Sequence, residues 1–548
     1  MTVDPLESLI ADRGAQALET LSALRAADPS TTGGRVLSYV YDSGLKGLDE
    51  LAVRAAGLAH GVNGLDPTVF TSVARIHGDI VATVRSILGG DIGGGDIGGG
   101  DAGNGDESGD VGSGKLGGDD DEVFGVVTSG GTESCVLAVL GAREMMGRAA
   151  GSGGTIVAPV TVHAAFRKAA HVLGMRFVGV EVDPATGRPE AQDLLAAVDD
   201  DTCLVVCSAP NYPTGVIDPV EQVAAGLEAH HDPRIGLHVD ACLGGLVLPF
   251  WPGGVGANWD LRVPRVTSIS AELHKYGFAP KGTSVLLSRG RARNRASWFA
   301  TVDWPGYPVV NPTLSGSKPL EPAAAAWAVL QALGQDGQRE LVARTARATE
   351  RLRAGLATIE GLHVMASDPG PLIAVVADES APDGRRVHPH LWADECGRRG
   401  FAVQGQPAYR QARGVLSSST HLTLTPVTER LVDEILDVAR GAVDAVRGMP
   451  APSPPAAFAG VLEALESGAL SPADLMALPE NDVHAMIAAV LEGDSVTNDI
   501  AGNDIADTGS GDASSEEGMA PLLAAIERLP DDVGARLVRA YLAAVMEG

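Results

Sequence analysis

Lys275 is the residue of this sequence whose type and position most clearly suggest chemistry. It is one of only six lysines, follows a short β-like run at residues 268–273, and comes directly after His274. An amine on a tight turn is easily desolvated, which lowers its pKa and suits it to Schiff-base formation with a carbonyl compound. Taken alone, such a position is more typical of a surface lysine, so the Schiff-base hypothesis depends on three features upstream.

The first feature is a glycine-rich turn at residues 128–134, with the sequence Thr-Ser-Gly-Gly-Thr-Glu-Ser. It follows an apolar run at 123–127 and precedes a helix-like stretch at 135–146. When a glycine turn joins a strand to the N-terminus of a helix, several backbone N–H groups point at a phosphate. The hydroxyls of Thr132 and Ser134 can add further donors. The turn lacks the Walker lysine, which disfavours nucleotide binding. A glycine-rich helix cap without a ligand stays open as the alternative.

The other two features are Asp240 and His163. Asp240 ends an apolar run at 235–240, where a carboxylate is costly unless a cation such as a protonated pyridine nitrogen meets it. His163 lies between an apolar strand at 155–160 and a helical stretch at 164–173, where its imidazole could lie flat on a cofactor ring. An aspartate that caps a turn and a histidine that caps a helix are the structural alternatives.

A phosphate cradle, a ring-stacking histidine, a carboxylate and a lysine, in that order, describe a site for pyridoxal 5′-phosphate (PLP). With these residues in place, the chain resembles the group II PLP-dependent decarboxylase superfamily and, within it, the soluble, prokaryotic type of sphingosine-1-phosphate lyase. The matching stretches lie at residues 34–41, 128–134, 163–170, 208–215, 238–245 and 268–282.

The resemblance implies PLP-dependent transferase fold type I, an α/β fold with a large, mostly parallel seven-stranded sheet domain and a smaller C-terminal α/β domain. It implies that Lys275 holds the cofactor as a Schiff base, that Asp240 pairs with the pyridinium nitrogen, and that His163 stacks on the ring. The cofactor-binding residues implied in this way are Gly131, Thr132, Ser134, His163, Asp240, His274, Lys275, Gly316 and Ser317. The loop at 313–318, which contains Gly316 and Ser317, resembles one that reaches the phosphate of a neighbouring subunit, so a homodimer with shared active sites is expected.

The expected reaction is retro-aldol cleavage of a phosphorylated long-chain amino alcohol to an aldehyde and phosphoethanolamine. Tyr41 and Lys281 match positions linked to substrate phosphate and proton transfer, although a core tyrosine and a solvated turn lysine are the alternatives. Asp66 stands where the lyase pattern has a histidine, and Lys318 where it usually has an arginine, so the substrate could differ. An amino-acid decarboxylase of the same superfamily and a catalytically silent PLP-binding interaction protein are therefore kept as alternatives.

Composition limits the partners and the compartment. The net charge of −29 argues against a nucleic-acid or anionic membrane surface, and no apolar run approaches the length of a membrane span. Five scattered cysteines without CxxC spacing fit reduced thiols and no metal site. We expect a cytoplasmic enzyme that acts on a small-molecule amine.

The pattern of apolar and helical stretches divides the chain into four regions. We expect an N-terminal helical segment at 1–60, with a helix at 5–27, a large PLP-binding domain at 61–320, a small α/β domain at 321–450 and a helical tail at 451–548. In the small domain, β-strands are predicted at 362–366, 371–376 and 416–424 after a helix at 321–356. A Gly/Asp-rich insertion at 89–122 is expected to be disordered, and the acidic stretch at 494–518 is expected to be a linker.

Overall fold

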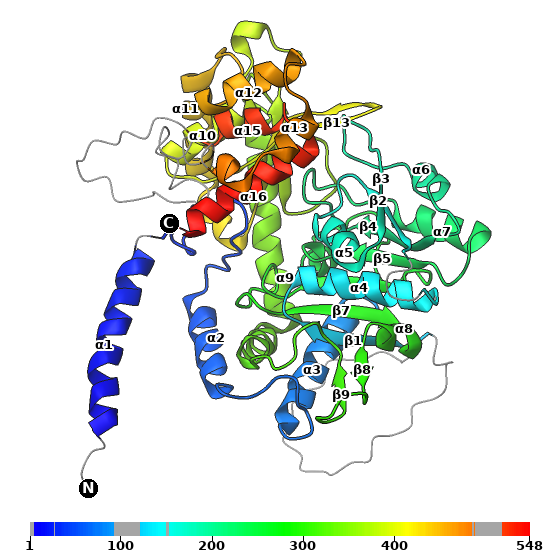
Figure 1. The fold of residues 1–548 in the computed structure, drawn as a ribbon. Helices are drawn as coiled ribbons and strands as arrows, with labels where there is room; N and C mark the ends of the chain where they lie inside the picture. Colours follow the sequence, from blue (N-terminus) through cyan, green and yellow to red (C-terminus); the bar gives the residue numbers. More distant parts are fainter. Residues whose placement is uncertain are drawn as a thin grey trace.

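A computed structural model of the chain describes residues 5–26, 28–91, 121–148, 153–484, 487 and 518–547. Nearly all of the predicted insertion at 89–122 and of the acidic linker at 494–518 lies outside these residues. The described part contains a large mixed sheet, a smaller antiparallel sheet and a group of C-terminal helices (Figure 1).

The large sheet has seven strands in the order β1-β7-β6-β5-β4-β2-β3. The strands are β1 (Val123–Thr128), β2 (Thr155–Pro159), β3 (Arg176–Val180), β4 (Thr202–Ser208), β5 (Gly236–Asp240), β6 (Ser268–Glu272) and β7 (Ser284–Arg289). Only β7 runs against its neighbours, and every residue of β2, β4, β5 and β6 is buried. Helices therefore cover both faces, which explains the unbroken apolar runs and confirms the predicted α/β fold with a mostly parallel seven-stranded sheet.

The helices that accompany this sheet alternate with its strands. They are α3 (Thr71–Ile87), α4 (Gly131–Met145), α5 (Ala165–Leu173), α6 (Ala191–Ala196), α7 (Val220–His230) and α8 (Arg291–Ala296). A short hairpin of β8 (Phe299–Thr301) and β9 (Val309–Asn311) projects from the body beyond α8 (Figure 1). Ligands of such sheets bind beyond the carboxyl ends of the parallel strands. His163 and Lys275 follow β2 and β6, and Asp240 is the last residue of β5.

The long helix α9 (Glu321–Leu356) connects the large sheet to the second one and breaks at Gly334, whose φ of 55° glycine tolerates. The second sheet is antiparallel, in the order β10 (Leu362–Val364), β11 (Leu372–Ala377), β15 (Ser419–Thr423) and β12 (Gln404–Gln406). Helices α10 (Pro389–Arg398) and α11 (Val432–Val446) contact each other beside it. The strand predicted at 416–424 is in fact two strands, β15 and the end of a separate hairpin of β13 (Tyr409–Gln411) and β14 (Gly414–Leu416).

The ends of the chain are helical. Helix α1 (Pro5–Ala26) extends away from the body, and α2 (Lys46–Leu58) packs on α9 (Figure 1). The C-terminal helices α12 (Ala456–Glu466), α13 (Pro472–Ala477), α15 (Ala520–Ile526) and α16 (Asp531–Glu547) have a hydrophobic cluster of their own. Short 3₁₀ helices lie at Gly244–Leu246, Leu248–Phe250, Asp383–Arg385 and Pro426–Arg430.

Separate hydrophobic clusters lie at the large sheet, at the small sheet and among the C-terminal helices. Leu48 of α2 and Leu341 of α9 belong to the cluster of the large sheet, and the division of the chain made from the sequence stays a prediction. No helix in the described ranges combines the length and the apolar character that crossing a membrane requires.

Candidate active site

A cavity of about 320 Å³ lies beyond the carboxyl ends of β4, β5 and β6. It brings together eight of the residues singled out in the sequence, which come from five separate stretches of the chain. These are Tyr41, Gly131, Thr132, His163, Asp240, His274, Lys275 and Lys281. The loops that follow parallel strands all lie at the same edge of the sheet, which explains why residues far apart in the sequence line one cavity.

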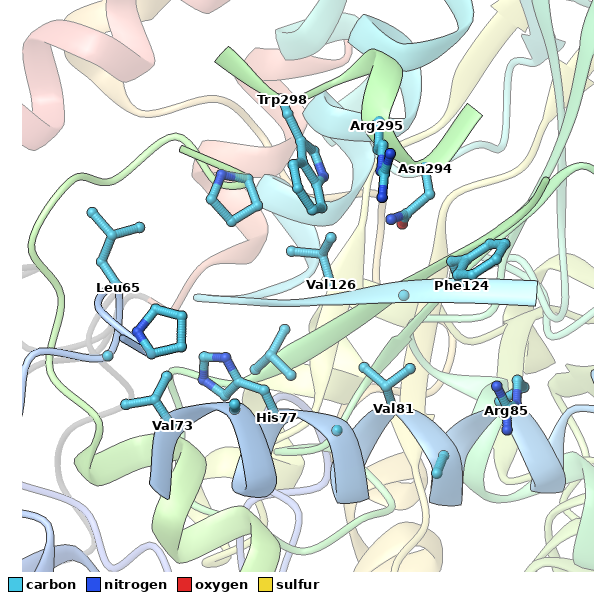
Figure 2. Close-up of a pocket in the computed structure, with 18 of the residues that line it drawn as sticks. Leu65, Val73, His77, Val81, Arg85, Phe124, Val126, Asn294, Arg295 and Trp298 are labelled. Atoms are coloured by element: carbon cyan, nitrogen blue, oxygen red, sulfur yellow. The ribbon is translucent and has the colours of Figure 1, made fainter. Parts of the chain in front are cut away.

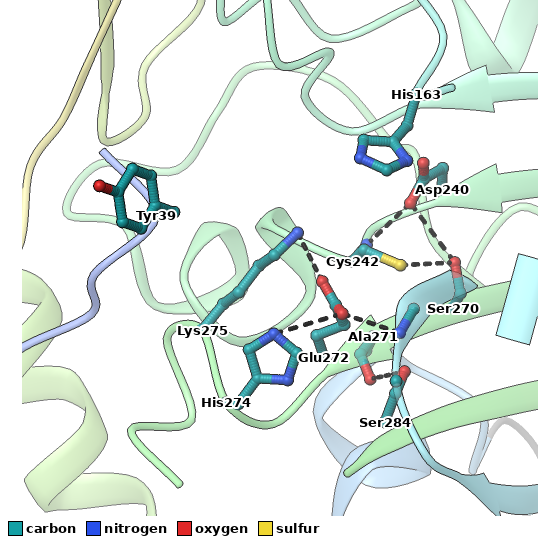
Figure 3. Close-up of polar contacts among 12 residues, drawn as sticks. Tyr39, His163, Asp240, Cys242, Ser270, Ala271, Glu272, His274, Lys275 and Ser284 are labelled. Atoms are coloured by element: carbon teal, nitrogen blue, oxygen red, sulfur yellow. Dashed lines mark hydrogen bonds and ion pairs between the residues drawn. The ribbon is translucent and has the colours of Figure 1, made fainter. Parts of the chain in front are cut away.

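The Lys275 amine lies against a carboxylate that the sequence analysis did not single out. Its Nζ is 2.5 Å from Glu272 Oε2, one turn earlier at the end of β6 (Figure 3). Burial works against the ammonium form, but the Tyr41 hydroxyl and the Glu272 carboxylate raise the pKa of Lys275 above its ordinary value. The expectation of a lowered pKa for Lys275 is therefore wrong, because these neighbours outweigh desolvation.

The glycine turn holds the other side of the same carboxylate. Gly131 N–H donates to Glu272 Oε1 at 2.7 Å, and His274 Nε2 lies 3.3 Å from that oxygen (Figure 3). A Cβ atom at position 131 would come within 2.7 Å of the Glu272 carboxyl carbon, so a larger residue here would have to displace this carboxylate. The Glu272 carboxylate thus marks a position where an anion is bound by the N-terminus of α4, the His274 imidazole and the Lys275 amine. A phosphate group is bound by donors of the same kinds. These residues fit the phosphate group of PLP.

Asp240 lies deeper in the cavity, with its Oδ1 accepting from the Cys242 N–H at 3.1 Å and from Ser270 Oγ at 3.4 Å (Figure 3). Burial opposes its ionisation, yet His163 and Lys275 lower the pKa of Asp240 below its ordinary value. A buried carboxylate that stays ionised is suited to a cationic ring nitrogen. His163 lies next to it at the cavity wall and accepts from the Ala165 N–H at 3.2 Å through Nδ1.

Tyr41 and Lys281 enter the cavity from the N-terminal segment and from the turn after β6. The Tyr41 ring packs edge-on against Tyr276, with the ring centroids 5.3 Å apart. Burial raises the pKa of Tyr41, so its phenol stays protonated at neutral pH. Lys281 Nζ donates to the Tyr39 carbonyl at 3.3 Å, which ties the segment that carries both tyrosines to the rim.

Three predicted residues do not face this cavity. The Ser134 hydroxyl is fully buried between Thr128 Oγ1 at 2.7 Å and Ser284 Oγ at 3.0 Å, so its side chain points at the sheet. Gly316 and Ser317 lie on an exposed loop outside the cavity wall.

Several residues at or beside the site were not predicted from the sequence, and three of them bear on its geometry. Glu272 occupies the anion position, and Tyr212 lines the wall while its ring stacks on His421 at 3.9 Å. Glu133 accepts from Ser129 N–H at 2.6 Å and from Leu314 N–H at 2.7 Å, so it fastens the exposed 313–318 loop to the glycine turn. Glu133 could have been noticed in the sequence, because a carboxylate is unexpected within a glycine-rich turn that binds an anion.

Two thiols also line the cavity. Cys135, Asp240 and Cys242 present ligand atoms within 4.8 Å of one another, a separation that a metal ion could bridge. Contact with Cys135 and burial raise the pKa of the Cys242 thiol well above its ordinary value, so it stays protonated at neutral pH.

A larger cavity of about 510 Å³ lies between α3, β1 and α8 (Figure 2). Its wall includes His77, Phe124, Trp298 and Lys318, but neither Lys275 nor Asp240. Burial and the nearby Lys318 amine lower the pKa of His77 to about 4, so this imidazole is neutral. The described residues of its wall include no carboxylate and no thiol, so the smaller cavity is the candidate active site.

Known proteins resemble the chain in sequence. The pyridoxal-dependent decarboxylase conserved domain matches residues 114–376. Sphingosine-1-phosphate lyase of Dictyostelium discoideum is 34% identical over 367 residues, which are 66% of this chain and 62% of that protein. The Mus musculus lyase is 33% identical over 366 residues, 66% of this chain and 58% of that protein, and the Arabidopsis thaliana lyase is 31% identical over 425 residues, 76% and 70%. The chain thus spans less than two thirds of the first two relatives.

Solved structures resemble it as well. The structure of Burkholderia pseudomallei sphingosine-1-phosphate lyase superposes with a TM-score of 0.65 and 26% identity, over 86% of this chain and 96% of that one. Lactobacillus brevis glutamate decarboxylase superposes with a TM-score of 0.64 at 18% identity over 82% and 94% of the chains, which shows the fold alone. These likenesses confirm the predicted fold type I class.

Proposed function

Because the chain belongs to the sphingosine-1-phosphate lyase family, within the pyridoxal-dependent decarboxylase superfamily, we propose that it cleaves a carbon–carbon bond in a phosphorylated long-chain amino alcohol. The products would be a long-chain aldehyde and phosphoethanolamine. PLP is the cofactor. The observation that carries the proposal is one cavity in which Lys275 and the ionised Asp240 lie on the wall together with an anion position at Gly131.

The cofactor supplies an electron sink for bond breaking beside the substrate amine. Within the cavity, Lys275 would hold it through Nζ, Asp240 would face the ring nitrogen and His163 would lie on the ring. Gly131 and His274 would hold its phosphate, because both contact the Glu272 carboxylate and can serve another anion in the same way.

Proton transfer falls to groups near the cavity mouth. The Tyr41 phenol is neutral, so we assign it the role of hydrogen-bond donor and proton relay and exclude a phenolate base. Lys281 is exposed at the rim and would meet the substrate phosphate. Asp66 accepts from the Thr68 and Val69 N–H groups, both at 3.1 Å, and is absent from the cavity wall, so its charge does not oppose a substrate phosphate in this subunit.

The direct test is incubation of the PLP-loaded protein with a long-chain amino alcohol phosphate. Aldehyde and phosphoethanolamine should appear in equal amounts. An amino-acid panel, with carbon dioxide detection, tests the decarboxylase alternative, which the name of the matching domain favours. Carbon dioxide from an amino acid without aldehyde from the phosphorylated amine would replace the lyase proposal, and cofactor binding without turnover on either panel would favour a silent PLP-binding protein.

We also propose a homodimer with shared active sites. The β8–β9 hairpin and the loop after it expose apolar side chains, including Val302 at 81%, Tyr307 at 70% and Phe299 at 59%. Such surface is usually covered by a partner. The exposed Gly316 and Ser317 follow this hairpin and would reach the neighbouring subunit's phosphate site. Sedimentation of the holoenzyme should give a dimer mass, and a monomer that is fully active would contradict shared sites.

We place the enzyme in the cytoplasm, since all five cysteines are buried free thiols, as in a reducing compartment.

Replacing Glu272 by glutamine should tighten binding of PLP to the cofactor-free protein. The Glu272 carboxylate occupies the anion position and would repel an entering phosphate. Two charges about 4 Å apart interact by roughly 1–4 kcal/mol between water and a partly buried site, so we expect about a tenfold gain or more. Titration of the cofactor-free protein, followed by visible absorption, measures it. Glu272→Asp keeps the charge and serves as the matched control. Weaker binding to Glu272→Gln than to the unaltered protein would mean that the carboxylate assists cofactor binding.

A further inference from the structure

A second cavity, of about 440 Å³, adjoins the candidate active site. Tyr212 and Gln404 line both cavities, so these two side chains form a wall between them. Val160 and Pro213 contribute to the large-sheet side, and Tyr409 and Leu416 to the opposite side. Its volume is within the range of small-molecule sites, roughly 300–1,000 Å³.

We infer that this second cavity binds the hydrocarbon chain of the substrate, an inference that rests on the proposed lyase function. Among the described residues that line the cavity, none carries a charge, and Val160, Met365 and Leu416 supply aliphatic surface. The charged groups Lys275, Asp240, Glu272 and Lys281 all line the neighbouring cavity. A molecule with a phosphorylated amino head and an apolar chain would therefore divide between the two compartments. Burial of each methylene raises affinity about fourfold.

The wall on the side of Leu416 is a fixed part of the fold. The β13–β14 hairpin is held at its tip by Glu181, which accepts from the N–H groups of Ala412 at 2.7 Å and Arg413 at 2.9 Å. Its base is held by Glu527 of the C-terminal helices, which accepts from Ala408 N–H at 2.9 Å and from Ser418 Oγ at 2.7 Å. The C-terminal helices thus help to position one wall of the chain-binding cavity, which gives this region of the protein a role.

Strand β14 offers a matched pair of test positions. Leu416 is half-buried and lines the cavity, whereas its neighbour Val415 is 44% exposed and is not part of the lining. Successive residues of a strand point to opposite faces, so a large side chain at 416 enters the cavity and one at 415 enters solvent.

The experiment compares Leu416→Trp and Val415→Trp holoenzymes on long-chain and short-chain amino alcohol phosphates. Leu416→Trp should lower kcat/KM for the long-chain substrate by about tenfold or more, the usual cost of a pocket mismatch, and leave the short-chain value within about twofold. Val415→Trp should change neither. Calorimetric binding of hexadecyl phosphate and butyl phosphate to the same proteins gives a readout independent of turnover, and only hexadecyl phosphate should bind more weakly to Leu416→Trp.

An equal loss for both chain lengths, or no loss for either, would overturn the chain-binding cavity while leaving the lyase function standing. Failure of the unaltered protein to cleave any amino alcohol phosphate would instead refute the proposed function. If Leu416→Trp loses the visible absorption of the bound cofactor, the smaller Leu416→Phe carries the same test with the same expected selectivity for the long chain.

Discussion

Replacing Lys275 by alanine is expected to remove the visible absorption of the bound cofactor and to lower kcat by at least about a thousandfold, because the amine that would hold the cofactor is lost. Lys275 and Lys281 both share the cavity with Asp240, and it is the Lys275 amine that contacts Glu272 at the anion position beside Gly131 (Figure 3). The absorption spectrum after dialysis and the rate of aldehyde release measure the two effects. Persistence of the absorption would place the covalent link on another amine.

This substitution also removes the ion-pair partner of Glu272, so instability must be separated from chemistry. Glu272 would keep only the Gly131 N–H and His274 as partners, and a buried group with an incomplete set of partners costs about 1–3 kcal/mol. The double variant Lys275→Ala, Glu272→Gln removes the unpaired carboxylate. Its unfolding temperature should be closer to that of the unaltered protein, while it stays inactive. Lys46→Ala, an exposed lysine on α2, is the matched control and should keep both absorption and rate.

Most of the candidate site could be predicted because its residues follow strands in a fixed order. His163, Asp240 and Lys275 each come after an apolar run, and the parallel sheet brings the ends of such runs to one edge. The glycine turn before α4 could also be predicted, because it lies between an apolar strand and a helix.

The rest depends on side-chain directions that one sequence does not contain. Glu272 looked like the last residue of a strand, and only the fold turns its carboxylate toward Gly131 and raises the pKa of Lys275. Ser134 lies in the first turn of α4, and its hydroxyl faces Ser284 on the sheet instead of the cavity. The break between β14 and β15 falls at Ser417 and Ser418, inside a run that alternates like one strand.

Replacing Asp240 by asparagine should leave the cofactor attached but lower kcat by about 10²–10³-fold, the usual cost of losing one preorganised electrostatic partner. Asparagine has nearly the same shape, and its Oδ1 can still accept from the Cys242 N–H and from Ser270 Oγ, so the fold should be kept. What it cannot supply is the negative charge that would keep a ring nitrogen protonated. The Asp240→Asn protein should therefore keep the absorption of the bound cofactor but release aldehyde much more slowly.

The pH dependence follows from the same carboxylate. Because the pKa of Asp240 is lowered in the folded protein, its ionised form contributes stability above the ordinary carboxyl pKa, and this contribution is lost as the pH falls through the folded value. Thermal unfolding of the unaltered protein should thus weaken more steeply toward acid than that of Asp240→Asn, which has no proton to bind at this position. Parallel acid curves for the two proteins, together with an undiminished kcat in Asp240→Asn, would show that residue 240 is not the charged partner of the cofactor ring.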